Sequence, residues 1–232
     1  MNVKILAVET ATEFCSAALL IGSRILLKHN PAPREHSRLI LDMVDELLVE
    51  SSLQLDNIDA LAYGAGPGSF TGLRIAASLL QGLAFGVNKS IIPISTLQAL
   101  AQAAWRRYEH TEVLAILDAR MDEIYYGFYQ LDNNGIMRNS LPDQVSSPYV
   151  LEILPAKYRS KNWHVVGTGI FTYYREIKMF LPQLELNMSL NYPSALEITI
   201  LAKHIFSTGG ELSAEKALPI YIRKEVVKNK YA

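Results

Sequence analysis

Gly64-Ala-Gly-Pro-Gly-Ser-Phe-Thr-Gly-Leu-Arg74 is the stretch on which the organisation of the chain depends. It follows a short apolar strand, 60–63, and leads directly into a segment, 71–86, whose pattern predicts a helix. Glycines at such a junction let an anion approach the free N–H groups and the partial positive charge of the first helical turn. They could equally form only a tight turn. The spacing matches neither a P-loop nor a dinucleotide-binding fingerprint.

The composition predicts a cytoplasmic protein without a membrane segment. Half of the 232 residues are hydrophobic, which suffices for one large domain or two modest lobes. The 22 Lys and Arg balance the 23 Asp and Glu, so no basic field would hold nucleic acid by itself. Cys15 is the only cysteine, which fits a reducing compartment, and we expect it to be buried in a strand. Arg74 and Gln81 interrupt the apolar runs before they reach membrane-spanning length.

Both halves of the chain begin with strands, which predicts a duplicated domain around a cleft. The strand patterns lie at 3–8, 15–21 and 24–29 in the first half and at 112–117 and 123–131 in the second. Each half also contains a Gly-rich strand-to-helix turn, the second being Gly167-Thr-Gly169. This layout resembles the two-lobed α/β fold of actin, Hsp70 and sugar kinases, in which each lobe is a mixed sheet with helices.

We therefore expect an N-terminal lobe, 1–108, that contains the Gly-rich loop, and a C-terminal lobe, 109–232. The last predicted helix, 194–207, could pack back on the first lobe. The basic tail, 218–232, is expected to be a solvated end, with RNA contact as the less favoured alternative.

Two predicted helices are more apolar than a single core requires. In 37–49 the apolar side chains spread over an arc of roughly 200°, whereas a helix resting on its own sheet needs about 100°. The helix 71–86 has only a narrow polar stripe. Both patterns favour a helix-on-helix interface with another subunit, although a neighbouring helix of the same chain would explain the first equally well. The predicted interface residues are Leu39, Ile40, Met43, Leu47, Ile75, Leu79 and Leu83.

Patterns for catalysis or metal binding are sparse. The five histidines are scattered, so we expect no protein metal site, and nothing nominates a base for Ser69. Asp118 and Glu123 with Arg120 between them are more typical of a surface ion network than of paired catalytic carboxylates. Any nucleotide in the cleft would be held by Glu9, Thr10, Gly66, Gly68, Ser69, Thr71 and Gly72, with Glu9 as the candidate carboxylate for its metal.

Five segments, in order along the whole chain, together resemble the TsaB family, also called YeaZ. They are Ile5-Leu-Ala-Val-Glu-Thr10, Arg34-Glu-His-Ser37, the Gly64–Arg74 stretch, Asp118-Ala-Arg120 with Glu123-Ile-Tyr125, and Pro219-Ile-Tyr-Ile-Arg223. The resemblance implies a role in making threonylcarbamoyladenosine in tRNA, as the heterodimeric partner of the catalytic paralogue TsaD and in a complex with the ATPase TsaE. It further implies that 37–49 and 71–86 dock as a four-helix bundle and that the chain alone forms a homodimer. It implies only indirect tRNA contact, with ATP or ADP entering at the level of the complex.

The resemblance also implies that this chain is not the catalyst. In TsaD a similar Gly-Pro-Gly loop precedes two histidines that bind an iron or zinc ion, and the corresponding positions here are Thr96 and Leu100. Neither can replace an imidazole ligand. We therefore expect a non-catalytic activator without a metal or resident cofactor. The alternatives are an ATP-binding kinase or ATPase that uses the cleft and, last, a peptidase. We also predict that Leu79→Glu or Met43→Glu abolishes partner binding and leaves the chain folded.

Overall fold

The computed structural model describes residues 2–181 and 184–223. Its strands are β1 Lys4–Glu9, β2 Phe14–Ile21, β3 Arg24–Pro31, β4 Ala60–Gly66, β5 Ser90–Ser95, β6 Glu112–Arg120, β7 Glu123–Leu131, β8 Met137–Asn139, β9 Gln144–Ser146, β10 His164–Val166 and β11 Glu185–Leu186. Its α-helices are α1 His36–Ser51, α2 Phe70–Gly86, α3 Thr96–Tyr108, α4 Ala156–Arg159, α5 Gly169–Thr172, α6 Tyr174–Phe180 and α7 Ala195–Ser207. Short 3₁₀ turns lie at η1 Leu55–Asn57, η2 Pro148–Glu152 and η3 Ala214–Lys216.

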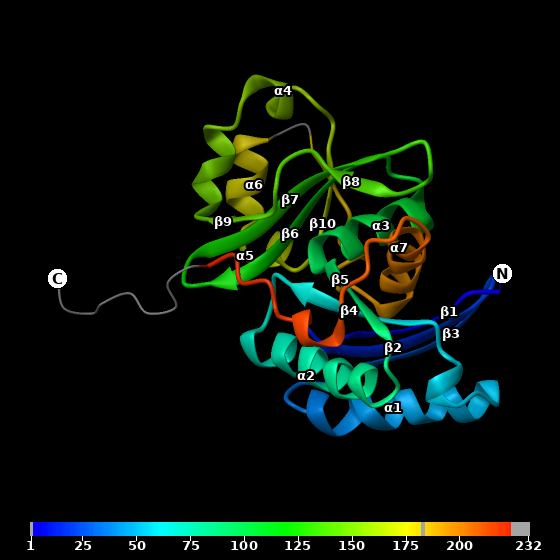
Figure 1. Cartoon of the computed structure of the whole chain (residues 1–232). Coiled ribbons are helices and arrows are strands. Elements are labelled where there is room, and N and C mark those ends of the chain that lie inside the picture. The colour runs from blue at the N-terminus through cyan, green and yellow to red at the C-terminus, as the bar shows by residue number, and fades with distance from the viewer. Residues whose placement is uncertain (1, 182–183, 224–232) are drawn as a thin grey trace.

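Two mixed sheets with the same internal order form the framework (Figure 1). The first runs β3-β2-β1-β4-β5, and the second runs β11-β10-β6-β7-β8, with β9 also paired to β7. In each, the opening strand is antiparallel to the next in sequence and parallel to the strand on its other side: β1 to β2 and β4, and β6 to β7 and β10. The second sheet thus repeats the topology of the first. The predicted two-lobed α/β fold of actin, Hsp70 and sugar kinases is confirmed.

Helices cover both faces of the first sheet because its central strands are apolar on both sides. Leu6 and Tyr63 face α1 and α2, whereas their neighbours Ile5 and Ala62 face α7 and part of α3. α7 therefore packs on the first lobe although it follows the second sheet in sequence (Figure 1). α3 lies between the lobes, with its other side against the second sheet.

Serine N-caps start the helices α2, α3 and α7. Ser69 Oγ accepts a hydrogen bond from Gly72 N (3.3 Å) at α2, and Ser95 Oγ accepts one from Gln98 N (3.2 Å) at α3. Ser194 Oγ accepts one from Leu196 N (3.2 Å) at α7. Each bond satisfies a donor that the first helical turn leaves free. The capping roles of these serines are readable in the sequence.

Within residues 2–181 and 184–223, no helix is both long and apolar enough to cross a membrane. Cys15 lies in β2 and is buried, as predicted.

Candidate functional site

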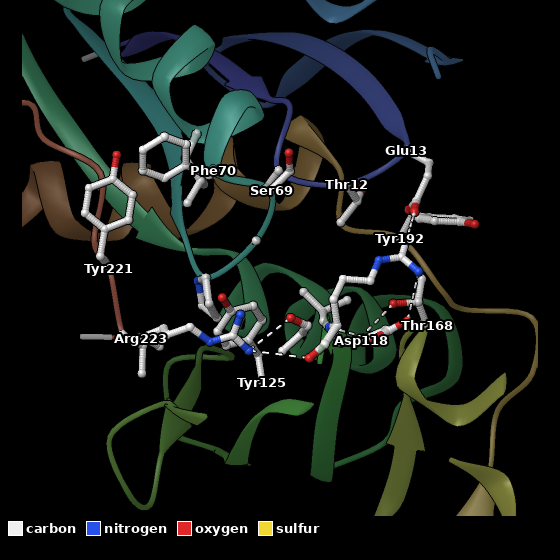
Figure 2. A pocket seen from close by; sticks show the side chains of 18 of the residues that line it. Thr12, Glu13, Ser69, Phe70, Asp118, Tyr125, Thr168, Tyr192, Tyr221 and Arg223 are labelled. Atoms are coloured by element: carbon white, nitrogen blue, oxygen red, sulfur yellow. Dashed lines mark hydrogen bonds and ion pairs between the residues drawn. The ribbon is translucent and has the colours of Figure 1, made fainter. Parts of the chain in front are cut away.

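A cleft of about 710 Å³ lies between the lobes (Figure 2). The turn after β1 supplies Thr12 and Glu13, the turn before α2 supplies Ser69, and the end of β6 supplies Asp118. The chain from 220 to 223 forms a further wall. The Gly-rich stretch therefore does reach the space between the lobes.

Most of the glycines in that stretch serve packing inside the first lobe. A Cβ on Gly72 would lie 1.9 Å from Thr10 O, and one on Gly68 would lie 2.6 Å from Ala11 O. Ser69 N donates to Ala11 O (2.8 Å), and Thr10 Oγ1 donates to Gly72 O (2.7 Å). The first turn of α2 is thus held directly against the turn that follows β1. The Ser69 N–H, a donor that could otherwise face a phosphate, is used in this contact.

Glu9 is a buried carboxyl and not a cleft residue. It is 1% exposed, and its Oε1 accepts a hydrogen bond from Ala11 N (2.6 Å). Oε2 has no hydrogen-bond partner among the described residues, and it lies so close to Gly64 that a Cβ there would be 1.9 Å away. Burial raises the pKa of Glu9 to about 7, and hydrogen bonds from the Ala11 and Thr10 backbone oppose the rise.

The expectation that seven residues line a phosphate site is corrected by these positions. Gly68 and Ser69 line the cleft. In the described structure Glu9, Thr10, Gly66, Thr71 and Gly72 do not. Four of these five are buried, because the loop folds onto the hairpin behind it; Thr71 is exposed outside the cleft.

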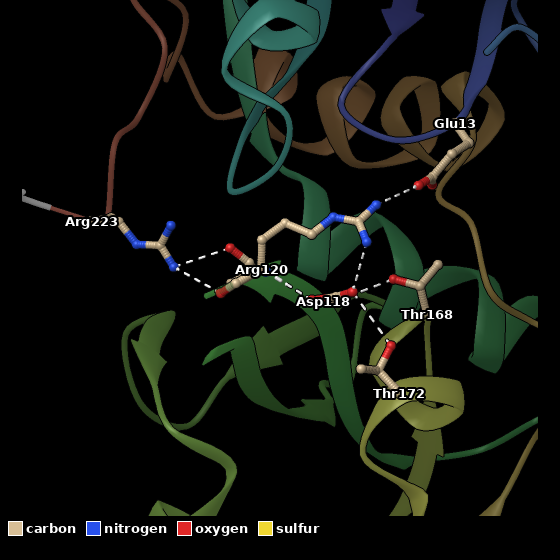
Figure 3. Close-up of polar contacts among 7 residues, drawn as sticks. Glu13, Asp118, Arg120, Thr168, Thr172 and Arg223 are labelled. Atoms are coloured by element: carbon tan, nitrogen blue, oxygen red, sulfur yellow. Dashed lines mark hydrogen bonds and ion pairs between the residues drawn. The ribbon is translucent and has the colours of Figure 1, made fainter. Parts of the chain in front are cut away.

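The polar contacts of the cleft centre on Asp118 at the end of β6 (Figure 3). Its Oδ1 accepts a hydrogen bond from Arg120 N (2.8 Å). Its Oδ2 accepts from Arg120 Nη1 (3.2 Å) and Thr172 Oγ1 (3.4 Å). The Arg120 guanidinium also reaches Glu13 Oε1 of the other lobe, at 3.5 Å. The ion network predicted around Asp118 and Arg120 is confirmed.

Arg223 lines the cleft, although its position in the basic tail predicted a solvated side chain. Its side chain is only 16% exposed and pairs with Glu123. Its position at the end of the Pro219-Ile-Tyr-Ile-Arg223 motif was the available signal. The rest of that tail, 224–232, lies outside the described residues.

Helices α1 and α2 lie side by side on the outside of the first lobe (Figure 1). Of the predicted interface residues, Leu39, Ile75, Leu79 and Leu83 are partly buried and border this surface. Ile40, Met43 and Leu47 are buried in the core of the same chain. The wide apolar arc of α1 is explained largely by its contacts with α2 and the sheet.

Contrary to the prediction that Met43→Glu leaves the chain folded, we expect this substitution to destabilise the fold. Met43 is 4% exposed and packs in the first core, so a carboxylate there would be desolvated without a partner. Side chains that do face outward on these helices are Leu41, Val49 and Phe85, the last 73% exposed.

Thr96 and Leu100 lie at the start of α3 and are both fully buried. Within the described parts of the chain, no group of three or more His, Cys, Asp or Glu side chains is placed to hold a metal ion.

Comparison with known proteins adds a family relationship to this geometry. A family model described as TsaD, tRNA N6-adenosine threonylcarbamoyltransferase, matches residues 30–212. The tRNA threonylcarbamoyladenosine biosynthesis protein TsaB of Escherichia coli is 39% identical over 226 residues, 96% of each chain. TsaB of Haemophilus influenzae is 37% identical over 238 residues, 97% of this chain and 95% of that one. The solved structure of YeaZ from Pseudomonas aeruginosa, 38% identical, superposes with a TM-score of 0.84 over 94% of this chain and 99% of that one.

Proposed function

This chain belongs to the TsaB family of tRNA threonylcarbamoyladenosine biosynthesis proteins, and on that premise we propose that it is a non-catalytic partner of TsaD. In this role it supports formation of the threonylcarbamoyl group on the tRNA adenosine next to the anticodon. Its contribution is a helical docking surface that activates the transferase. The family model for TsaD, which matches most of this chain, supports a shared scaffold.

The outer surface of α1 and α2 is the observation that carries the proposal. Leu79 and Leu83 are only partly covered, and Phe85 is largely exposed. A Cβ built on Gly82 would meet no atom within 4 Å, so a partner helix could approach the backbone there. Apolar surface of this kind favours protein contact over solvent. In the isolated chain the same surface is expected to pair with a second copy.

The lack of a catalytic role is supported by residue chemistry. Thr96 and Leu100 occupy the positions that correspond to the metal-binding histidines of TsaD, and neither side chain provides an imidazole. Two carboxylates of the cleft lining, Asp118 and Glu13, are both engaged by the Arg120 guanidinium.

Leu79→Glu tests the docking surface. We expect it to weaken binding of TsaD by about 30-fold or more, because a charge would be desolvated at the centre of the contact. The matched control is Ile153→Glu on the other lobe, where the side chain is 78% exposed and the change should leave both affinity and melting temperature unaltered. Titration calorimetry gives the affinities. Equal affinity of Leu79→Glu and wild type would refute the interface.

Reconstitution tests the activating role directly. TsaD, the ATPase TsaE and the threonylcarbamoyl adenylate are expected to modify tRNA efficiently only when this chain is added. Full modification in its absence would contradict the proposal.

A nucleotide-binding role is the second candidate, favoured by the size of the cleft and by Ser69 at the start of α2. Calorimetric titration of the isolated chain with ATP and ADP distinguishes it. Micromolar binding with turnover would favour an enzyme, whereas no heat of binding favours the partner role.

A further inference from the structure

The segment 211–223, termed the strap, runs along the first lobe and ends on the second. It starts beside β5, where Ile91 and Leu212 exchange two backbone hydrogen bonds of 2.8 Å. It then passes α2, where Gln81 Nε2 donates to Ala214 O (3.2 Å). The strap is therefore fixed to the first lobe from its beginning.

Its middle is attached to β4 and the Gly-rich stretch. Ile220 N donates to Ala65 O (2.7 Å), and Tyr63 OH donates to Leu218 O (3.0 Å). Gly66 has a φ of +123°, and a Cβ on it would lie 2.7 Å from Ile220 O. A side chain at Gly66 would thus displace the strap. Gly66 is therefore needed for packing of the strap, whether or not the loop binds a ligand.

Tyr221 connects the strap to the first turn of α2. Its ring centroid lies 5.4 Å from that of Phe70, and its hydroxyl accepts a hydrogen bond from Arg74 Nε (3.0 Å). The Arg74 guanidinium in turn lies over the Phe70 ring at 3.9 Å. Figure 2 shows Tyr221 and Phe70 on the first-lobe side of the cleft and Arg223 beyond them.

Arg223 then crosses to the turn between β6 and β7. Arg120 at the end of β6 and Met121 and Asp122 in the turn have φ values of 59°, 57° and 59°, a left-handed conformation that costs about 1 kcal/mol or more per non-glycine residue. Arg223 Nη2 donates to Ala119 O (3.0 Å) and to the Glu123 carboxylate. A cation from the C-terminal segment thus stabilises the turn that positions Asp118 and Arg120 (Figure 3).

We infer that the strap couples helix α2 to the β6–β7 turn, so that engagement of α2 by a partner sets the position of Asp118 and Arg120 in the cleft. Contacts at Tyr221 and at Arg223 are only two residues apart, and both ends are anchored by polar bonds. The part of the inference that concerns a partner rests on the proposed function. Coupling within the isolated chain does not.

Hydrogen exchange of the isolated chain tests the coupling through Tyr221→Ala, which removes a contact with α2 and none with the turn. We expect the amides of 118–125 to exchange about threefold to tenfold faster, as loss of an aromatic contact at the strap allows. Tyr108→Ala is the matched control, since Tyr108 is similarly exposed and its ring contacts His110 at 5.5 Å, away from the strap. It should leave 118–125 unchanged. Faster exchange confined to 70–74 in Tyr221→Ala would overturn the inference.

Two Arg223 variants and added TsaD complete the test. Arg223→Gln should accelerate exchange in 118–125, and Arg223→Lys, which keeps the charge but not the planar fork, should do so less. TsaD should slow exchange at 118–125 in the wild type but not in Arg223→Gln. Protection of 70–86 alone in the wild type would overturn the coupling. Failure of TsaD to bind the wild type would instead refute the proposed function, and the isolated-chain comparison would still decide the coupling.

Discussion

At the scale of single residues, Glu9 was predicted to contact a bound nucleotide or its metal, but its side chain is buried in the first lobe. It ends β1, but it is covered by Gly64 and by the turn that leads to Ala11. Its carboxyl is therefore removed from water, which disfavours the charged form.

Replacing Glu9 should change how stability depends on pH. The pKa of Glu9 is about 7 in the folded chain against 4.5 when exposed, so the folded state holds the proton longer. Its contribution is fully present below pH 4.5 and is lost as the pH rises to about 7. The loss is about 3 kcal/mol of unfolding free energy. Glu9→Gln should lack this fall and be the more stable protein at pH 8.

Urea unfolding of both proteins at several pH values between 4.5 and 8 measures this. The difference between the two curves cancels the titration of the other groups. Parallel curves across that range would show that the Glu9 carboxyl is already ionised at low pH.

At the scale of elements, the Gly-rich stretch and α2 form one unit whose glycines have different purposes. Gly72 permits contact between α2 and the backbone at Thr10, whereas Gly82 lies on the open outer side of the same helix. The same residue type is thus a packing requirement at one end of α2 and free surface at the other.

Two alanine substitutions separate these roles. Gly72→Ala should destabilise the fold by roughly 1–3 kcal/mol, because its Cβ would meet Thr10 O at 1.9 Å and neither backbone can yield easily. Gly82→Ala should stabilise the chain by about 0.5–1 kcal/mol, as expected for alanine in a helix interior with open space. Thermal and urea unfolding report both changes. Equal effects of the two substitutions would contradict the packing role of Gly72.

At the scale of the whole molecule, the position of a helix in the sequence does not decide which lobe it packs on. α7 follows the second sheet but packs on the first, and it is tied to α3 by an ion pair. Glu197 is fully buried, and its Oε1 accepts from Arg106 Nε (2.8 Å) and Nη2 (2.7 Å). Burial raises the pKa of Glu197, and the Arg106 guanidinium opposes that rise.

Arg106→Met should therefore destabilise the molecule by about 3–5 kcal/mol at pH 8, because it leaves a buried carboxylate without its partner. The loss should be smaller at pH 5, where Glu197 can take up a proton. Adding Glu197→Leu to the first change should restore much of the stability. A double variant no more stable than Arg106→Met would argue against the ion pair as the cause.

The main strands and helices, the duplicated layout and the serine caps were determined by the sequence itself, because they depend on local periodicity and on residues a few positions apart. The short strands β8, β9 and β11 were not, because they exist only through pairing with β7 or β10. The family motif includes Arg223, but the motif alone does not predict which groups that side chain contacts. Tertiary structure alone decided that Met43 faces inward, that Glu9 is sealed behind Gly64 and that Arg223 stabilises a turn a hundred residues earlier in the chain. These outcomes depend on which surfaces meet when the lobes assemble. The glycines of the Gly64–Arg74 stretch therefore permit the close packing that holds the start of α2 and the strap against the first lobe.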